Sequence, residues 1–305
     1  MRILITGGAG YKGVVLASEL LKLGHKVTIL DNFMYGFDFV LHLVGNPSLE
    51  IVREDIRNIQ DTLVKDYDVI FHLAAISGYP ACEANPHSAQ LINIDASRHL
   101  GKLLGKQQVL IYASTTSFYG KSGDVCTEES KVDPVSLYGI SKYQAEQSLM
   151  QRENTVALRF ATIFGVSPKM RIDLLVNDFA YKAVNDRCIV LFDSHSKRTF
   201  LHIKDAISAY IFTIDNLTNM CGQIFNIGDN SLNYSKLEVA KHIQKFTDCK
   251  IIESDLEDYD IRNFIISFDK ICRLGFSTQW TLDDGIAELV KLYQFYRPFT
   301  TYKTI

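Results

Sequence analysis

Short apolar runs alternate with longer stretches of helical period along the first half of the chain. We predict strands at residues 2–6, 26–30, 50–52, 67–73, 108–113 and 155–160. Helices are predicted at 12–23, 88–104 and 136–152. The strands are apolar on both faces, which is typical of a parallel sheet covered by helices on each side. The pattern therefore predicts an α/β fold built on a doubly wound parallel sheet.

The pattern changes after about residue 165. A helix is predicted near 172–184, then short strands at 189–192, 200–203 and 223–227, then two helices with acidic loops within 235–305. No low-complexity linker separates the two halves. We expect one domain over 1–165, to which segments near 196–228 return, and a smaller mixed α/β part over 166–305 that binds the substrate.

Composition excludes several classes of protein. The chain has 305 residues, of which 47% are hydrophobic and 22% charged, so it can bury a sizeable core and resembles ordinary soluble proteins. Lysine and arginine total 32 and aspartate and glutamate 35, which gives a net charge of -3. A nucleic-acid-binding domain would be basic, so we expect no nucleic-acid partner.

Neither a compartment signal nor a metal motif is visible. No basic and then apolar leader and no apolar run of about 18 residues occurs, so we expect a cytoplasmic protein without a membrane span. The cysteines are scattered, and no pair has C-x-x-C spacing. No histidine pair has H-E-x-x-H spacing. We therefore expect reduced thiols and no metal site.

A glycine-rich turn lies between the first predicted strand and the first predicted helix. Gly7, Gly10 and Gly13 are spaced G-x-x-G-x-x-G within TGGAGYKG. Such glycines permit a tight turn, a close approach of a pyrophosphate to the backbone, and close packing of helix on strand. Amides at the helix N-terminus then face the anion. Lys12 departs from the usual apolar residue, and we expect its stem to pack while its ammonium reaches water.

An acidic residue, Asp31, ends the second predicted strand. A carboxylate in this position accepts hydrogen bonds from a ribose diol and repels a 2′-phosphate, so NAD is expected rather than NADP. A strand-end aspartate can also simply cap a loop, but the glycine turn favours the cofactor hypothesis. Asp55 and Ile56, after the third strand, are candidates to flank the adenine.

A tyrosine and a lysine, Tyr138 and Lys142, are four residues apart on a predicted helix and so share one face. A nearby cation favours the phenolate form of a tyrosine, which can then accept a proton while a hydride leaves the same carbon. The spacing alone is common on solvated helices. The hydroxyl-rich segment 113–120 strengthens the hypothesis, because it leaves the fifth strand at the edge where parallel sheets bind ligands.

Together these motifs resemble the extended short-chain dehydrogenase/reductase family of nucleotide-sugar enzymes, whose fold is of the Rossmann type. The resemblance covers nearly the whole chain. Its motifs are TGGAGYKG at 6–13, HLAA at 72–75, STTSFYG at 114–120, YGISK at 138–142, LRFATIFG at 158–165, RTFLHIKDA at 198–206 and RNFIISFDKICRLGF at 262–276. The segment 166–179 particularly resembles UDP-sugar 4-epimerase-like proteins and nucleotide-heptose 4-dehydrogenases.

The resemblance implies a set of site residues. The implied catalytic residues are Thr115, Tyr138 and Lys142. Residues implied to contact NAD are Gly7, Gly10, Tyr11, Lys12, Gly13, Asp31, Asn32, Asp55, Ile56, Leu73, Ala74, Ala75, Asn93, Tyr138 and Lys142. Those implied to bind a nucleotide-sugar substrate are Thr116, Asn177, Arg198 and Arg262. Asn177 and the two arginines would hold its diphosphate.

One departure narrows the implied chemistry. The 4,6-dehydratases of the family carry an Asp-Glu pair where this chain has Thr116 and Ser117, so dehydration is disfavoured. The expected reaction is oxidation at C4 of the sugar, by a 4-epimerase or a 4-dehydrogenase. A keto-sugar reductase, a 4,6-dehydratase and a non-catalytic NAD-binding protein remain alternatives. Relatives pair through helices equivalent to 88–104 and 136–152, so a homodimer is expected.

Overall fold

A seven-stranded parallel sheet forms the centre of the protein in a computed structural model that describes residues 1–256 and 263–297. Its strands lie in the order β11-β7-β5-β4-β1-β2-β3. They are β1 (Arg2–Thr6), β2 (Lys26–Asp31), β3 (Leu49–Arg53), β4 (Val69–His72), β5 (Val109–Thr115), β7 (Thr155–Phe160) and β11 (Ile224–Ile227). The structure thus confirms the six strands predicted in the first half, and the predicted strand at 223–227 joins the same sheet beside β7.

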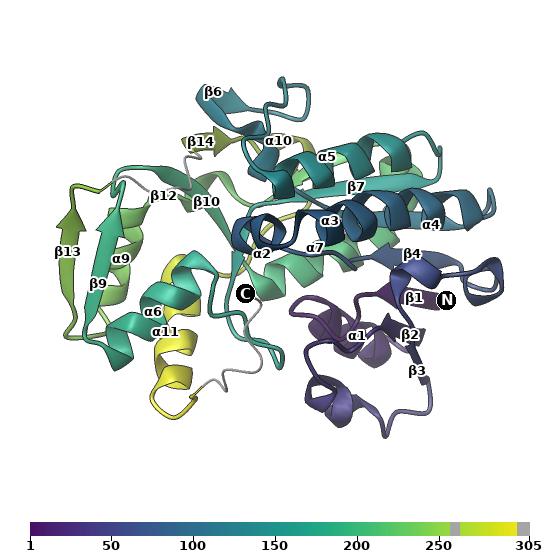
Figure 1. The fold of residues 1–305 in the computed structure, drawn as a ribbon, viewed down its shortest axis with the longest axis horizontal. Coiled ribbons are helices and arrows are strands. Elements are labelled where there is room, and N and C mark those ends of the chain that lie inside the picture. The colour runs from purple at the N-terminus through teal and green to yellow at the C-terminus, as the bar shows by residue number, and fades with distance from the viewer. Residues whose placement is uncertain (257–262, 298–305) are drawn as a thin grey trace.

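Helices cover both faces of this sheet (Figure 1). Helices α1 (Gly13–Lys22) and α7 (Ile203–Asp215) pack on one face, and α4 (Ser97–Leu103) and α5 (Leu137–Leu149) pack on the other. Alternate side chains of β1 point to opposite faces of the sheet. Ile3 and Ile5 pack in the core beneath α1 and α7, and Leu4 packs in the core beneath α4 and α5. Burial on both faces explains why the strands read as continuous apolar runs.

The predicted helix 88–104 is less regular than expected. It consists of α3 (Pro86–Ala89), a π-helical stretch Gln90–Ala96 and then α4. The π-helical stretch contains Asn93. Its side-chain amide accepts a hydrogen bond from the backbone N–H of Ile76 and donates one to the carbonyl of the same residue. Wider helical turns of this kind frequently occur at functional sites.

The predicted strand at 200–203 is confirmed as part of β10 (Lys197–His202), but the helix that follows it, α7, which begins at Ile203, was not predicted. The signal was present in the sequence. Ile203, Ala206, Ile207, Tyr210 and Ile214 follow a helical period, and all five are buried. The helix begins at Ile203 with His202 as its N-cap, so the predicted strand overlaps the first helical residue and conceals the boundary.

The second half builds a separate apolar core. Strand β9 (Cys188–Phe192) pairs with β13 (Lys250–Ser254), and α6 (Leu175–Asn185), α9 (Lys236–Gln244) and α11 (Leu282–Tyr293) pack beside them (Figure 1). The remaining strands, in two small sheets, are β8 (Thr162–Phe164), β12 (Asn233–Ser235), β6 (Lys121–Cys126) and β14 (Asn263–Ile266). Short helices are α2 (Tyr79–Ala84), α8 (Leu217–Met220) and α10 (Asp269–Cys272). The boundary at residue 165 stays a prediction.

Within the described residues, every helix is too short or too polar to cross a membrane.

Candidate active site

A cavity of about 680 Å³ opens at the carboxyl ends of the central strands. Its wall includes the glycine turn after β1, Asp31 at the end of β2, residues 73–78 after β4, Thr115 at the end of β5 and Phe160 at the end of β7. The volume lies within the range of cofactor and small-molecule sites, and this edge of a parallel sheet is where such folds bind ligands. A ligand in the cavity would therefore meet both groups of residues that the motifs identified.

The glycine turn has the geometry that the sequence predicted. Gly7 has a φ of +71°, and a Cβ there would lie 2.7 Å from the nitrogen of Ala74. A Cβ on Gly13 would lie 2.4 Å from the carbonyl oxygen of Gly7, so α1 can start only on a glycine. Gly10 lines the cavity, and a Cβ there would meet only the Gly7 oxygen within 4 Å. The turn is thus an open cradle that suits a close-packed pyrophosphate.

Asp31 both holds the turn and faces the cavity. Its carboxylate accepts hydrogen bonds from the amides of Ala9 at 3.0 Å and Phe33 at 2.9 Å. Burial raises the pKa of Asp31, and these backbone hydrogen bonds act in the opposite direction. The structure therefore shows the loop-capping role of Asp31, and it also places the carboxylate in the wall of the cavity where the cofactor role is expected.

The predicted adenine-side residues lie next to Asp31 in the cavity wall. Asn32 donates to Asp55 at 3.2 Å, and Asp55 also accepts from Arg57 at 2.8 Å. The hydrogen bond from Arg57 lowers the pKa of Asp55 well below its usual range. Ile56 and the predicted residues Leu73, Ala74 and Ala75 complete this part of the wall.

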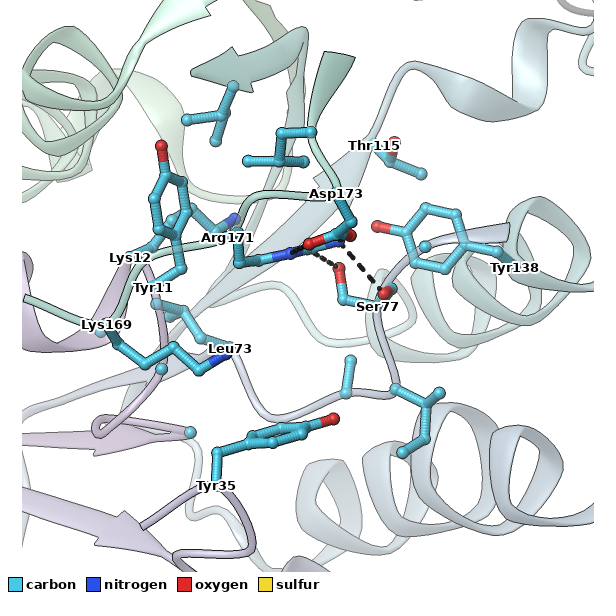
Figure 2. Close-up of a pocket in the computed structure, with 18 of the residues that line it drawn as sticks. Tyr11, Lys12, Tyr35, Leu73, Ser77, Thr115, Tyr138, Lys169, Arg171 and Asp173 are labelled. Carbon is cyan, nitrogen blue, oxygen red and sulfur yellow. Dashed lines mark hydrogen bonds and ion pairs between the residues drawn. The ribbon is translucent and has the colours of Figure 1, made fainter. Parts of the chain in front are cut away.

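Thr115 and Tyr138 lie together at the other end of the cavity (Figure 2). Thr115 is the last residue of β5, and its hydroxyl donates to Ser117 at 2.8 Å. Tyr138 lies in the first turn of α5, whose N-terminus is capped by the Ser136 side chain. Lys142 is one turn further on but lies behind the cavity wall, 3% exposed, with its ammonium 4.1 Å from the Tyr112 ring centroid.

The electrostatics of the pair differ from the expectation. Burial raises the pKa of Tyr138, and the groups that lower it are Ser77, Arg171 and Thr115. Burial also lowers the pKa of Lys142 to about 7, which Glu146 partly opposes. Desolvation disfavours the charged forms of both side chains, so the lysine alone does not produce a phenolate here.

Residues that the sequence analysis missed face Tyr138. Figure 2 shows the Arg171 guanidinium between Asp173 and Ser77, on the side of the cavity that Tyr138 faces. Arg171 forms an ion pair with Asp173 and donates to the Ser77 hydroxyl at 3.0 Å. Ser77 follows the HLAA motif at the carboxyl end of β4. Because ligands bind at the carboxyl ends of the strands in such sheets, its position in the sequence marks it as a candidate site residue. Arg171 lies inside the segment 166–179, where only Asn177 was selected.

The predicted substrate residues separate into different environments. Arg198 is 2% exposed, lines the cavity and donates to the Lys197 carbonyl at 3.0 Å. Asn177 is buried behind the wall and accepts from the Gly165 amide at 3.0 Å, and Thr116 donates to the Phe160 carbonyl at 3.1 Å. Both therefore have structural hydrogen bonds. Arg262 lies outside the described residues.

The fold and the site together define a class of protein. A parallel sheet with a glycine-rich turn and a strand-end aspartate at one cavity is typical of the dinucleotide-binding α/β fold. Residues 3–228 match the NAD dependent epimerase/dehydratase family, and the chain belongs to this family. This membership confirms the expected extended short-chain dehydrogenase/reductase class and NAD as the cofactor.

Curated relatives match over nearly the whole chain. The UDP-N-acetyl-alpha-D-glucosaminuronate decarboxylase of Bacillus cytotoxicus is 32% identical over 97% of this chain and 92% of its own length. The CDP-paratose 2-epimerase of Salmonella typhi is 28% identical over 95% of this chain and 98% of its own. The solved UDP-glucuronic acid 4-epimerase of Bacillus cereus, in complex with UDP-glucuronic acid and NAD, aligns with a TM-score of 0.84 at 26% identity, over 97% of this chain and 100% of that one.

Proposed function

We propose that the protein catalyses NAD-dependent oxidation at C4 of a nucleotide-activated sugar, as a 4-epimerase or a 4-dehydrogenase. The supporting observation is that the Thr115 and Tyr138 side chains line the same cavity as the glycine cradle and Asp31. A dinucleotide held by the cradle and by Asp31 would extend along the cavity wall toward these two hydroxyl-bearing side chains. When bound, NAD supplies the two-electron oxidant, which accepts the hydrogen of C4 as a hydride.

The residues of the chain handle the proton of the sugar hydroxyl. Tyr138 accepts this proton as phenolate, and Thr115 orients the same oxygen by a hydrogen bond. Burial opposes the phenolate, whereas Ser77 and Arg171 favour it. Lys142 contributes positive charge from behind Tyr138 when it is protonated. Ser77 and Arg171 therefore share with Lys142 the electrostatic role that the sequence gave to the lysine alone.

Dehydration stays disfavoured in this proposal. The two positions after Thr115 carry Thr116, whose hydroxyl donates to the Phe160 carbonyl at the end of β7, and Ser117, whose hydroxyl accepts from Thr115. A neutral serine or threonine hydroxyl is neither the acid nor the base that proton transfer at C5 and C6 requires. Re-reduction of the ketone from its other face gives epimerisation, and its release gives a net dehydrogenase.

Oxidation followed by decarboxylation is a second candidate. The specific observation that favours it is the Arg171 guanidinium beside Tyr138, because an arginine fork binds a carboxylate in two-pronged geometry. The 32% identical relative is a sugar-acid decarboxylase. A uronic-acid substrate would compete with Asp173 for Arg171.

Product analysis tests the proposal. The purified protein is incubated with NAD and with UDP-, GDP-, CDP- and dTDP-sugars, including uronic acids and heptoses, and the products are read by mass and NMR. An unchanged mass with inverted C4 indicates epimerisation, a loss of two hydrogens indicates oxidation, and a loss of carbon dioxide indicates decarboxylation. Tyr138→Phe is expected to lower kcat by about 100-fold or more while it preserves NAD binding. Full turnover by this variant would exclude Tyr138 as the base.

The oligomeric state and the division of labour are also proposals. We propose a homodimer that pairs through α4 and α5, which lie side by side on one face of the sheet. We also propose that the 166–305 part binds the nucleotide, with Arg198 as a donor to its diphosphate. Sedimentation equilibrium measures the mass of the assembly, and a monomer at micromolar concentration would contradict the dimer.

A further inference from the structure

Lys12 is the residue of the glycine turn that departs from the apolar pattern, and its side chain lies in the cavity wall. Its ammonium is 4.4 Å from the ring centroid of Phe160 and 5.8 Å from that of Tyr210. Within the described residues its contacts are with these aromatic faces rather than with a carboxylate. Aromatic faces stabilise a cation without neutralising it, so the charge remains available to a ligand.

The side chain carries its charge away from the turn. The backbone of Lys12 belongs to the proposed pyrophosphate cradle, whereas Phe160 is the last residue of β7 and pairs in register with Thr115 of β5. The ammonium over Phe160 is therefore near the end of the cavity where Thr115 and Tyr138 lie. A pyrophosphate contact would instead require the side chain to fold back over its own turn.

Other positive charges face the same region. Burial, together with repulsion from Lys142 and Arg171, lowers the pKa of Lys12 to about 7. Arg171 has Asp173 as its partner, but the charge of Lys12 is not balanced in this way. The reacting end of the cavity therefore has an excess of positive charge when Lys12 is protonated.

We propose that Lys12 tunes the bound cofactor, because its ammonium disfavours the positively charged oxidised nicotinamide relative to the neutral reduced one. This inference rests on the proposed function, which puts the nicotinamide at the Thr115 and Tyr138 end. Like charges in a partly desolvated site repel more strongly than in water. The effect makes the bound NAD a stronger oxidant and shifts the first step toward the keto-sugar.

An effect of Lys12 on the nicotinamide can be distinguished from a contact between Lys12 and the pyrophosphate. Oxidised and reduced cofactor carry the same pyrophosphate, so any attraction between Lys12 and phosphate cancels in the ratio of the two dissociation constants. Only an interaction that senses the charge of the nicotinamide ring changes this ratio. ADP-ribose, which lacks the ring, reports the phosphate contribution alone.

The experiment measures dissociation constants of NAD⁺, NADH and ADP-ribose by calorimetry at pH 6, where Lys12 is protonated. It uses the cofactor-free full chain, Lys12→Met, Lys12→Arg and the control Lys169→Met. Lys169 lines the same cavity with its ammonium 4.4 Å from the Tyr35 ring centroid, on the Asp31 side. Lys12→Met is expected to lower Kd(NAD⁺)/Kd(NADH) about tenfold, whereas Lys12→Arg and Lys169→Met leave the ratio unchanged.

Each outcome is decisive. An unchanged ratio in a folded Lys12→Met variant, or an equal change for all three ligands, overturns the inference and leaves the proposed function intact. Failure of the unmodified chain to bind either dinucleotide overturns the proposed function itself. Lys12→Gln, which keeps a polar side chain without the charge, provides the same comparison if the methionine variant does not fold.

Discussion

At the scale of the residue, single side chains in this cavity combine structural and chemical roles. Asp31 fixes the glycine turn through the Ala9 amide and also presents a carboxylate to the cavity. Thr115 donates to Ser117 and lies beside the phenol of Tyr138 (Figure 2). Asp31 was predicted because it ends the second strand, whereas Thr115 was implied by the family resemblance. The structure places both residues at strand ends, where the backbone fixes the direction of the side chain.

Asp31→Asn is expected to reduce the preference for NAD over NADP. The substitution removes the charge that repels a 2′-phosphate and one acceptor for the ribose diol, so NAD binds more weakly and NADP more tightly. The ratio Kd(NADP)/Kd(NAD), measured by calorimetry, should fall about tenfold or more. Asp55→Asn is the control, because Asp55 lines the same cavity but is paired with Arg57. An unaltered ratio in Asp31→Asn would remove its role in selecting the cofactor.

At the scale of the element, α5 is held against the sheet by a buried ion pair. Glu146 lies one turn beyond Lys142, and its carboxylate is 2.7 Å from the Arg159 guanidinium of β7. Ser114 of β5 donates to the same carboxylate at 2.5 Å. Both charged side chains are 4% exposed or less. This pair fixes the helix that carries Tyr138 and Lys142 relative to the strand end that carries Thr115.

Arg159→Met is expected to lower the free energy of unfolding by about 3–5 kcal/mol, because it leaves the Glu146 charge buried without its partner. The double variant Glu146→Leu with Arg159→Met should recover much of this loss. Urea denaturation of the cofactor-free protein measures both. Lys182 forms a more exposed ion pair with Asp178 at 2.7 Å, which serves as the control. Lys182→Met should lower the free energy of unfolding by less than about 1 kcal/mol. A similar cost for both single variants would contradict the role assigned to the buried pair.

At the scale of the whole molecule, contacts between the glycine turn and residues 165–167, at the predicted boundary of the two parts, help to form the cavity. The Tyr11 hydroxyl donates to the Gly165 carbonyl at 2.7 Å, and the Ser167 hydroxyl donates to the Tyr11 carbonyl at 2.8 Å. The segment that follows contains Lys169 and Arg171, both in the cavity wall. The first turn of the chain and the start of the second half thus position each other.

The stability of the cofactor-free protein is expected to rise with pH above neutrality. Burial lowers the pKa of Lys142 to about 7, from an ordinary value of 10.5. Between these values the unfolded chain binds a proton that the folded chain does not, so the free energy of unfolding increases with pH. Below pH 7 both states are protonated and this contribution is flat. The lowered pKa values of Lys12 and Lys169 act in the same direction.

Urea denaturation at pH 7, 8 and 9 measures this slope, which is at most about 1.4 kcal/mol per pH unit for each lysine. Lys142→Met should show a smaller increase over the same range because it lacks the titrating group. Equal slopes in the two proteins would show that Lys142 is not desolvated in the folded state.

Local sequence was sufficient to predict those features of the fold that depend on a single helix, strand or turn. The glycine spacing predicts the turn, and the double-faced apolar runs predict a buried parallel sheet, because both depend on backbone sterics and burial within a few residues. Helix α7 was missed because the predicted strand 200–203 includes Ile203, the first residue of the helix, and because the N-cap is His202 rather than a typical Ser, Thr, Asp or Asn. The π-helical stretch that contains Asn93 has no comparable local signal, since its hydrogen bonds reach across to Ile76.

The sequence by itself determined the class of fold, through periodicity and spacing that act over short distances, and the family, through the resemblance of its motifs; it also predicted Asp31, Thr115 and Tyr138 as site residues. Only the tertiary structure decided which charges meet. It brought Ser77 and Arg171 to Tyr138, directed Lys12 toward Phe160 and set Lys142 behind the wall. The physical reason is that desolvation and Coulomb interactions depend on distances between side chains far apart in the chain, which the folded packing sets.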